Sequence, residues 1–369
     1  MQDIFSLIPL PALAAGGVAL LVALLLVATK RWHGRLTMDS DQGIQKVHTQ
    51  PTPRVGGIAI AAGMFAGYLL SGKDGRHLLG PLMLAGTPAF AFGLLEDITK
   101  KVSVRTRLLA TMACSVLGWL ITGYSITDVN LAGINWLLSF TGISVIFTAF
   151  AVGGVANAIN IIDGFNGLAA GTIIIILTAF GLLSSALGDP ELAYTSLILA
   201  GAVLGFMLVN WPLGKIFLGD GGAYFVGFAV AWLAVLLVGR HPGVSAWAPM
   251  LVVAYPVLEV VFSIVRRRRR NLSPGDPDRL HLHSLVKRRL VRSIFPQSSS
   301  LVRNSATGAM MWLAALLPAV ISILWPVNTF MLVFGLLVFS LLYVAVYARL
   351  TQFRWCLGAA TTRAATPAI

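Results

Sequence analysis

Residues 157–171 read Asn-Ala-Ile-Asn-Ile-Ile-Asp-Gly-Phe-Asn-Gly-Leu-Ala-Ala-Gly, a polar hinge between two apolar segments at 136–152 and 168–187. A transmembrane helix needs about 20 mostly apolar residues, so each flanking segment is a candidate membrane span. Amides and a carboxylate are costly at a membrane boundary, and their default interpretation is functional. The pattern predicts a functional site where two spans meet.

The whole chain follows this pattern of apolar segments separated by polar hinges. Hydrophobic residues make up 57% of it and charged residues 11%, whereas charged residues make up about 25% of a soluble domain. The sequence therefore predicts an all-α polytopic membrane protein, with residues 1–369 forming a single integral membrane domain. We expect about eleven transmembrane helices, at 9–28, 55–71, 78–95, 107–122, 136–152, 168–187, 193–209, 223–239, 246–265, 308–325 and 328–348.

Basic residues are distributed unevenly between the two sets of connecting loops. One set carries 24 of the 27 Lys and Arg residues, and loops rich in Lys and Arg stay on the cytoplasmic side. This bias predicts a periplasmic N-terminus, a cytoplasmic C-terminus and a cytoplasmic loop at 266–307. The basic excess also suits contact with anionic membrane lipids, and the chain has no recognisable nucleic-acid-binding module.

Acidic residues are few, and several lie in hinges that this topology places on the cytoplasmic face. These hinges contain Glu96-Asp97, Asp163 and Asp220. Because they fall on one face, an active site on the cytoplasmic face is favoured over a transport pathway. A divalent cation is the simplest partner for several clustered carboxylates.

Two of these hinges, taken alone, also allow an ordinary structural explanation. Glu96-Asp97 precedes Lys100 and Lys101, so the acids either form weak surface ion pairs or meet a metal or a phosphate. Asp220 stands in Phe-Leu-Gly-Asp-Gly-Gly. That sequence describes a turn as well as a magnesium site with few carboxylates and substrate phosphates.

The hinge at 157–171 is richer in polar groups. Asn157 and Asn160 face the same direction if the fifth span continues through them as a helix. These amides and the Asp163 carboxylate suit a nucleobase edge or ribose hydroxyls, and Gly164 permits close backbone approach to a ligand. Helix capping by Asn and Asp is the structural alternative.

The loop at 266–307 contributes Arg279, His281 and His283. A His-x-His pair suits zinc, but third and fourth ligands at a fitting spacing are missing from the sequence. Contact with a diphosphate is therefore the better interpretation. Glu259, inside the ninth span, is expected to pair with one of the arginines at 266–270.

The sequence resembles the bacterial polyprenyl-phosphate N-acetylhexosamine-1-phosphate transferases, relatives of the phospho-N-acetylmuramoyl-pentapeptide transferase. The motif Asn-x-x-Asn-x-x-Asp-Gly-x-Asn-Gly-Leu-Ala-x-Gly at 157–171 is highly specific for them. Three further stretches support the likeness, which covers nearly the whole chain. They are Pro-Thr-Pro-Arg-Val-Gly-Gly at 51–57 with His48 before it, Phe-x-Gly-Asp at 217–220, and Asp-Arg-x-His-x-His at 278–283.

The resemblance implies a magnesium-dependent enzyme of the bacterial inner membrane, with manganese as the alternative ion. Such an enzyme transfers an N-acetylaminosugar-1-phosphate from a UDP-sugar to undecaprenyl phosphate and releases UMP. This reaction starts the synthesis of O-antigen or related glycans. N-acetylglucosamine (GlcNAc) is our first choice of sugar, with GalNAc, FucNAc and QuiNAc as alternatives. A homodimer is the assembly to consider.

The resemblance also implies roles for individual residues. Asp97, Asp163 and Asp220 form the catalytic set, and Asp220 and Asp97 are the expected metal ligands. Uridine is expected to contact Gly164, Phe165, Asn166, Asn210 and Phe217, with the Phe217 ring stacked on the base. Arg279, His281 and His283 are expected to face the diphosphate or the sugar. The residues expected to bind substrate are Arg107, Asn157, Asn160, Gly164, Phe165, Asn166, Asn210, Phe217, Arg279, His281 and His283.

Two positions depart from the family pattern, and two other classes of protein compete with it. Glu96 stands where relatives commonly have Asp, so a role is transferred to Asp97 only. Ala223 stands where relatives often have Ser, which removes one hydroxyl. A lipid-linked sugar transporter predicts ionisable groups near the middle of the membrane and inverted repeats. A scaffold protein has no need for the polar hinges.

Overall fold

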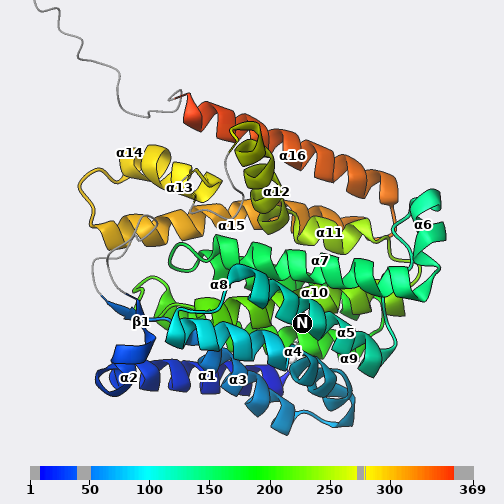
Figure 1. Cartoon of the computed structure of the whole chain (residues 1–369), viewed down its shortest axis with the longest axis horizontal. Coiled ribbons are helices and arrows are strands. Elements are labelled where there is room, and N and C mark those ends of the chain that lie inside the picture. Colours follow the sequence, from blue (N-terminus) through cyan, green and yellow to red (C-terminus); the bar gives the residue numbers. More distant parts are fainter. Residues whose placement is uncertain (1–8, 40–50, 272–277, 279, 353–369) are drawn as a thin grey trace, which may run out of the picture.

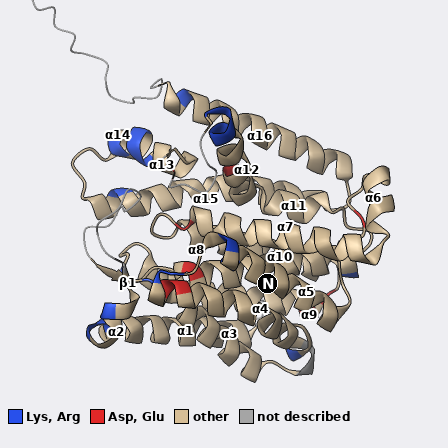
Figure 2. Ribbon diagram, viewed as in Figure 1, with Lys and Arg blue, Asp and Glu red and all other residues tan. Residues whose placement is uncertain are grey.

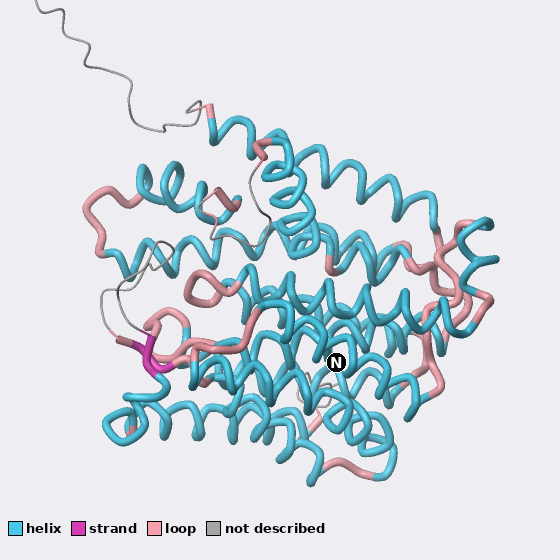
Figure 3. Tube along the Cα trace, viewed as in Figure 1, coloured by secondary structure: helices cyan, strands magenta, loops and turns pink. Residues whose placement is uncertain are grey.

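The computed structural model describes residues 9–39, 51–271, 278 and 280–352. It is a bundle of helices that run mostly side by side, with the loops at its two ends (Figures 1 and 3). The elements are α1 (Leu10–Ala28), α2 (Lys30–Thr37), β1 (Met38–Asp39), β2 (Thr52–Pro53), α3 (Gly56–Leu70), α4 (Lys73–Thr99), α5 (Val104–Thr122), α6 (Ala132–Leu138), α7 (Thr141–Ile162), α8 (Leu168–Ala186), α9 (Pro190–Asn210), α10 (Gly219–Arg240), α11 (Trp247–Val252), α12 (Ala254–Arg269), α13 (Leu282–Val286), the π-helix η2 (Lys287–Val291), α14 (Arg292–Ile294), α15 (Ser300–Leu324) and α16 (Thr329–Thr351).

Among the described residues, nine helices are long and apolar enough to cross a membrane, which confirms the polytopic membrane class. They are α1, α4, α5, α7, α8, α9, α10, α15 and α16. The expected span at 55–71 is α3, which has only 15 residues. The expected span at 246–265 is divided into α11 and α12. Pro256 explains this break, because proline has no N–H to donate to the carbonyl of Val252, where α11 ends. The count of eleven spans stays a prediction.

Two helix boundaries differ from the expected ones, and both changes affect the candidate site. The fifth span, expected at 136–152, is the helix Thr141–Ile162, so Asn157 and Asn160 are helical. The eighth, expected at 223–239, begins at Gly219, so Asp220 lies in the first turn of α10 and not in a loop. Apolar windows end where polar residues begin, although the backbone hydrogen bonds of a helix continue through such residues.

The centre of the bundle is α10. Every residue of this helix from Gly219 to Leu233 is buried, and α3, α4, α5, α7 and α8 pack around it (Figure 1). The approach of α4 is close, because a Cβ on Gly93 would lie 2.6 Å from the carbonyl oxygen of Asp220. Asp97 follows Gly93 by four residues and therefore faces the same way on α4. Close helix packing thus brings Asp97 to the beginning of α10.

The charged residues gather at one end of the bundle, here called the basic end, which carries α2, β1 and α14 (Figure 2). Acidic residues lie beside β1 at the same end (Figure 2). The opposite end carries α6 and the loop from α10 to α11 (Figure 1). The hinges that the sequence assigns to one face therefore do lie at one end, and the positive-inside rule predicts that this end is cytoplasmic.

Cysteine labelling in intact cells tests the orientation. We expect Arg288→Cys, exposed at the basic end, to resist a membrane-impermeant thiol reagent until the cells are permeabilised. Gly133→Cys, exposed in α6 at the other end, is the matched control and should react at once. Both variants also carry Cys356→Ser, so that the reagent cannot label this native cysteine. The other native cysteine, Cys114, is buried and can stay. Labelling of Arg288→Cys alone in intact cells contradicts the orientation.

Candidate active site

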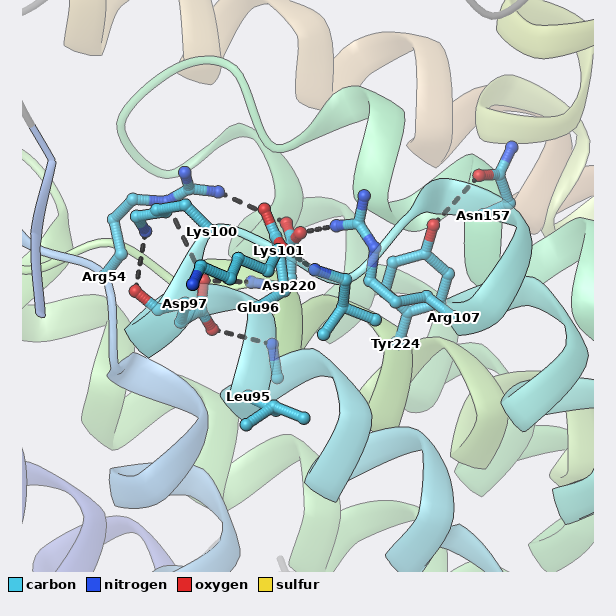
Figure 4. A network of polar contacts seen from close by, with 12 residues as sticks. Arg54, Leu95, Glu96, Asp97, Lys100, Lys101, Arg107, Asn157, Asp220 and Tyr224 are labelled. Carbon is cyan, nitrogen blue, oxygen red and sulfur yellow. Dashed lines mark hydrogen bonds and ion pairs between the residues drawn. The ribbon is translucent and has the colours of Figure 1, made fainter.

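Asp97 joins the end of α4 to the beginning of α10 (Figure 4). Its Oδ1 accepts a hydrogen bond from the backbone N–H of Asp220 at 2.9 Å, and its Oδ2 accepts one from Gly221 at 2.8 Å. The first N–H groups of a helix have no partner within the helix, and a carboxylate there also meets the positive end of the helix dipole. Because Asp97 is only 1% exposed, it acts as a buried cap of α10.

Glu96, its neighbour in sequence, has a different task. Its Oε2 accepts a hydrogen bond from the backbone N–H of Val102 at 2.7 Å, so it closes the turn between α4 and α5. Lys100 donates to the carbonyl oxygen of Asp97 at 2.6 Å. The structure therefore gives the two acids different partners, and the expectation that only Asp97 has a role in the reaction stays a prediction.

Asp220 lies between two arginines. Nη2 of Arg54 is 3.2 Å from its Oδ1, and Arg107 pairs with its Oδ2. Arg54 also reaches toward Asp97, with Nε 3.9 Å from Oδ1. Asp220 and Arg107 are both buried, so their attraction is screened less than that of a surface pair. The result is a compact cluster of opposite charges at the beginning of α10 (Figure 4).

Two short backbone contacts place Arg54. The strands β1 and β2 pair antiparallel, with Met38 opposite Pro53. The carbonyl of Pro53 then accepts a hydrogen bond from the N–H of Phe217 at 2.8 Å, and the N–H of Gly56 donates to the carbonyl of Phe217 at 2.9 Å. The segment around Arg54 is thereby fastened to the segment that leads into α10. These strands are an exception to the all-α expectation, which is otherwise confirmed.

The last turns of α7 face the same cluster. The hydroxyl of Tyr224 donates to Oδ1 of Asn157 at 3.2 Å, and the guanidinium of Arg107 lies 5.4 Å from the centre of the Tyr224 ring. Asp163 follows α7 directly. Burial raises the pKa of Asp163 to about 6, against the opposing effects of Arg54 and of a backbone hydrogen bond from Gly219. Asp163 therefore belongs to the same charged cluster as Asp220 and Arg54.

The loop after Asp163 is held from behind by protein contacts. Gly167 has a φ of +74°, a conformation that glycine adopts without strain. Its N–H donates to Oδ1 of Asn210 at 2.7 Å, and its carbonyl accepts from Nε1 of Trp312 at 2.8 Å. Asn166 is buried and donates to Oγ of Ser305 at 3.3 Å. Asn166 and Asn210 shape this loop, and their predicted contacts with uridine stay predictions.

The His-x-His segment reaches the other side of this loop. The rings of Phe165 and His283 are 5.4 Å apart in an edge-to-face arrangement, and Nε2 of His283 lies 3.6 Å from where a Cβ on Gly164 would be. Nζ of Lys287 lies 5.2 Å from the centre of the Phe165 ring. The structure thus brings the His-x-His segment next to the hinge at 157–171, as a single site requires.

Glu259 is the clearest surprise near the site. It was expected to pair with an arginine of 266–270, and in the described part of the chain that expectation is wrong. Its Oε1 accepts from the backbone N–H of Leu282 at 2.8 Å and lies 3.0 Å from Nδ1 of His281. Histidine partners were not foreseen, because Glu259 and His281 are 22 positions apart in the sequence and no sequence signal indicates their contact.

Two residues of the site were not predicted from the sequence, and one predicted residue lies outside the described residues. Arg54 and Tyr224 contact the charged cluster, but neither residue was predicted to belong to the site. Arg54 stands in the Pro-Thr-Pro-Arg motif, and that motif was the signal that could have found it. The predicted residue Arg279 lies outside the described residues. Phe217 is half-buried, and its predicted stacking on uridine stays a prediction.

The donor set can be compared with what magnesium requires. Within the described residues, no three His, Cys, Asp or Glu side chains are grouped so that they could hold a metal by themselves. Magnesium usually takes one or two protein carboxylates and completes its shell with phosphate and water. Asp220 fits this use better, since its carboxylate oxygens pair with the side chains of Arg54 and Arg107. Asp97 fits it less well, since both of its oxygens accept backbone hydrogen bonds.

Fold and site together define a multi-pass membrane protein with a buried cluster of carboxylates and arginines at one end of its helices. Residues 79–238, which include the first three polar hinges, match the family described as glycosyl transferase family 4. The chain is 30% identical over 249 residues to an undecaprenyl-phosphate alpha-N-acetylglucosaminyl 1-phosphate transferase of Salmonella typhi, covering 66% of this chain and 67% of that protein.

Two further relatives agree. A decaprenyl-phosphate N-acetylglucosaminephosphotransferase of Mycolicibacterium smegmatis is 31% identical over 265 residues, which cover 64% of this chain and 65% of the relative. A probable undecaprenyl-phosphate N-acetylglucosaminyl 1-phosphate transferase of Bacillus subtilis is 28% identical over 242 residues, which cover 65% and 66%. The chain spans about two thirds of the length of these relatives. It belongs to glycosyl transferase family 4, and the relatives are named as phosphoglycosyltransferases.

The capping role of Asp97 can be tested by thermal unfolding. Asp97→Asn keeps one acceptor oxygen but sets an NH₂ group against a backbone N–H. We expect it to destabilise the protein by about 1–3 kcal/mol, measured as a lower melting temperature in detergent. Glu96→Gln is the matched control, because Gln can still accept from Val102, and it should change stability by less than about 0.5 kcal/mol. An Asp97→Asn protein as stable as the wild type would show that Asp97 is not a cap.

Proposed function

We propose that this protein transfers an N-acetylaminosugar-1-phosphate from a UDP-sugar to undecaprenyl phosphate and releases UMP. The observation that supports this most directly is the cluster of Asp97, Asp163 and Asp220 with Arg54 and Arg107 at one end of the membrane helices. It combines cations for phosphate groups with carboxylates for a metal or a proton. An acceptor with a long apolar tail suits a site that lies at the ends of transmembrane helices.

The chemistry that we propose is a phosphoryl-group transfer between two anions. A phosphate oxygen of the lipid forms a bond to the phosphorus that carries the sugar. The bond from that phosphorus to the bridging oxygen breaks, and UMP leaves with this oxygen and its electron pair. Protein side chains need not form covalent bonds in such a reaction, because positioning and charge neutralisation lower the barrier.

The arginines are suited to the neutralising role. Arg54 and Arg107 pair with Asp220, and Arg binds phosphate as well as carboxylate through its fork of N–H donors. Binding a diphosphate would let them exchange one anionic partner for another. Asp220, and less readily Asp97, would hold Mg²⁺, or Mn²⁺ as the alternative. When bound, the ion would supply Lewis acidity and neutralise phosphate charge.

The polar hinge at 157–167 would receive the nucleotide sugar. Asn157 and Asn160 lie on the last turns of α7 beside Tyr224, and Gly164 and Phe165 face His283. Asp163, with a pKa raised to about 6 by burial, is ionised at neutral pH and could orient a hydroxyl or accept a proton. GlcNAc remains our first choice of sugar because the relatives are named for it, with GalNAc, FucNAc and QuiNAc as alternatives.

The cellular setting is also part of the proposal. The basic end would face the cytoplasm, where UDP-sugars are available, and the protein would lie in the bacterial inner membrane. Its product would start the assembly of O-antigen or a related surface glycan. A homodimer stays a prediction. The rival, a lipid-linked sugar transporter, needs ionisable groups along a path across the membrane, whereas the carboxylates of this site gather at one end (Figure 2).

Replacement of Asp220 tests the proposed reaction. We expect Asp220→Asn to reduce UMP release from UDP-GlcNAc and undecaprenyl phosphate by about 100-fold or more, because removing one electrostatic group from a transition-state site typically costs this much. Wild-type activity should require the lipid and should vanish with EDTA. Glu96→Gln is the control and should stay active. A folded Asp220→Asn protein with near-normal turnover removes Asp220 from the reaction.

A further inference from the structure

Glu259 and the two histidines of the His-x-His segment form a buried group on the side of the 163–167 loop that is opposite to Asn210 and Trp312. Glu259 is 1% exposed, His283 3% and His281 9%. The two imidazole rings are nearly parallel, with 9° between their planes and 5.2 Å between their centres. Stacked in this way, both rings present Nδ1 to the same carboxylate.

The two carboxylate oxygens of Glu259 have different contacts. Oε1 of Glu259 lies 3.0 Å from Nδ1 of His281 and also accepts from the N–H of Leu282. Oε2 lies 3.9 Å from Nδ1 of His283. Among the described side chains, these last two atoms are both buried without a hydrogen-bond partner. An unpaired buried polar atom costs about 1–3 kcal/mol, so a proton on Nδ1 of His283 would satisfy both atoms after a small movement.

The far side of the His283 ring faces the site. Its Nε2 lies 3.6 Å from the position of a Cβ on Gly164, in the hinge where the sugar nucleotide is proposed to bind. Burial lowers the pKa of His283 to about 4, against the opposing influence of Glu259, so the ring is neutral at neutral pH. A neutral imidazole carries one N–H, and if Nδ1 holds the proton, Nε2 is an acceptor.

The geometry points to Glu259 as a positioning residue that holds His283 as the Nδ1–H tautomer, with Nε2 turned to the substrate as a hydrogen-bond acceptor. This inference rests on the proposed function for the identity of the ligand. An acceptor nitrogen recognises a hydroxyl or an amide N–H of the sugar and repels the oxygens of a phosphate. Of the two contacts expected for His283, with the diphosphate or with the sugar, the sugar is thereby favoured.

Two competing donors must be separated in the test. The hydroxyls of Tyr255 and Tyr343 are also buried without a hydrogen-bond partner in the described chain, and both residues interact electrostatically with Glu259. If either tyrosine, and not His283, donates to Oε2 of Glu259, the tautomer of His283 is not set by Glu259. Tyr255→Phe and Tyr343→Phe distinguish these arrangements without changing either histidine, and a tautomer set by Glu259 should be the same in both variants.

The first experiment reads the tautomer directly by NMR of protein labelled with ¹⁵N-histidine in detergent micelles, with His283→Asn used to assign the signal. We expect protonated Nδ1 and unprotonated Nε2 for His283 in the wild type. In Glu259→Gln the Nε2–H form should appear, whereas both tyrosine variants and the distant control Glu191→Gln should leave the signal unchanged. An Nε2–H tautomer in the wild type, or a His283 signal that responds to a tyrosine variant but not to Glu259→Gln, overturns the inference.

The second experiment compares two ligands, UDP-GlcNAc and UDP, by calorimetric titration. In metal sites, loss of the partner that orients a histidine typically costs 10–100-fold in affinity. By analogy, we expect Glu259→Gln to weaken UDP-GlcNAc binding about tenfold and to leave UDP binding unchanged. Adding His283→Ala to Glu259→Gln should weaken UDP-GlcNAc binding little further, because the two changes act on one contact. Equal weakening of UDP and UDP-GlcNAc binding overturns the sugar contact.

Failure of the proposed function would look different. If the wild type bound neither ligand and released no UMP, the sugar-transfer proposal would be wrong. The NMR measurement needs no ligand and no turnover, and it would still decide whether Glu259 sets the His283 tautomer.

Discussion

The cap that Asp97 places on the first turn of α10 is the interaction on which the rest of the site depends. The cap exists because α4 and α10 approach closely at Gly93, where a Cβ would lie 2.6 Å from the carbonyl of Asp220. Capping fixes where α10 begins and hence where Asp220 stands. The position of Asp220 in turn places the guanidinium groups of Arg54 and Arg107. A change in the packing of α4 against α10 would therefore move the charged side chains of the cluster.

The cluster has the electrostatic character that a phosphate-transfer site needs. Arg54 and Arg107 offset the negative charge of Asp220, which would be costly if it were unpaired in a buried position. Anionic substrates and a divalent cation would redistribute these pairs without requiring a new fold. The polar groups lie at the end of the bundle, and the helices themselves offer apolar surface to a lipid. Water-soluble and lipid-bound substrates can meet where these two environments join.

Much of this arrangement could be predicted from sequence, because the informative residues are local. The hinges with Asp97, Asn157–Gly167 and Asp220 stand out as polar breaks between apolar segments, and all of them lie at one end. The end of α7 and the beginning of α10 could not be placed in this way, since the apolar pattern stops at polar residues such as Asn160 and Asp220, whereas the helices include them.

The contacts between distant segments were the part that sequence could not supply. Arg54 meets Asp220 across 166 residues, and Glu259 meets His281 across 22. Such pairs depend on which helices pack together, and apolar periodicity does not encode helix neighbours. For the same reason Trp312 and Ser305 on α15, which hold the 164–167 loop from behind, carried no signal. The expected partner of Glu259 was one of the arginines at 266–270, which are closer to it in sequence than His281 is, whereas in the structure His281 lies beside it.

The central claim is that polar segments far apart in the chain form one site at the basic end, and proximity cross-linking tests it most directly. Phe165→Cys and His283→Cys, combined in a chain that also carries Cys356→Ser, should be joined by a short bifunctional thiol reagent, since the native rings are 5.4 Å apart. Phe165→Cys with Gly133→Cys, at opposite ends of the bundle, should not be joined. Efficient linking of the first pair alone is the predicted result. Failure of that pair to link in folded, reactive protein would contradict the single site.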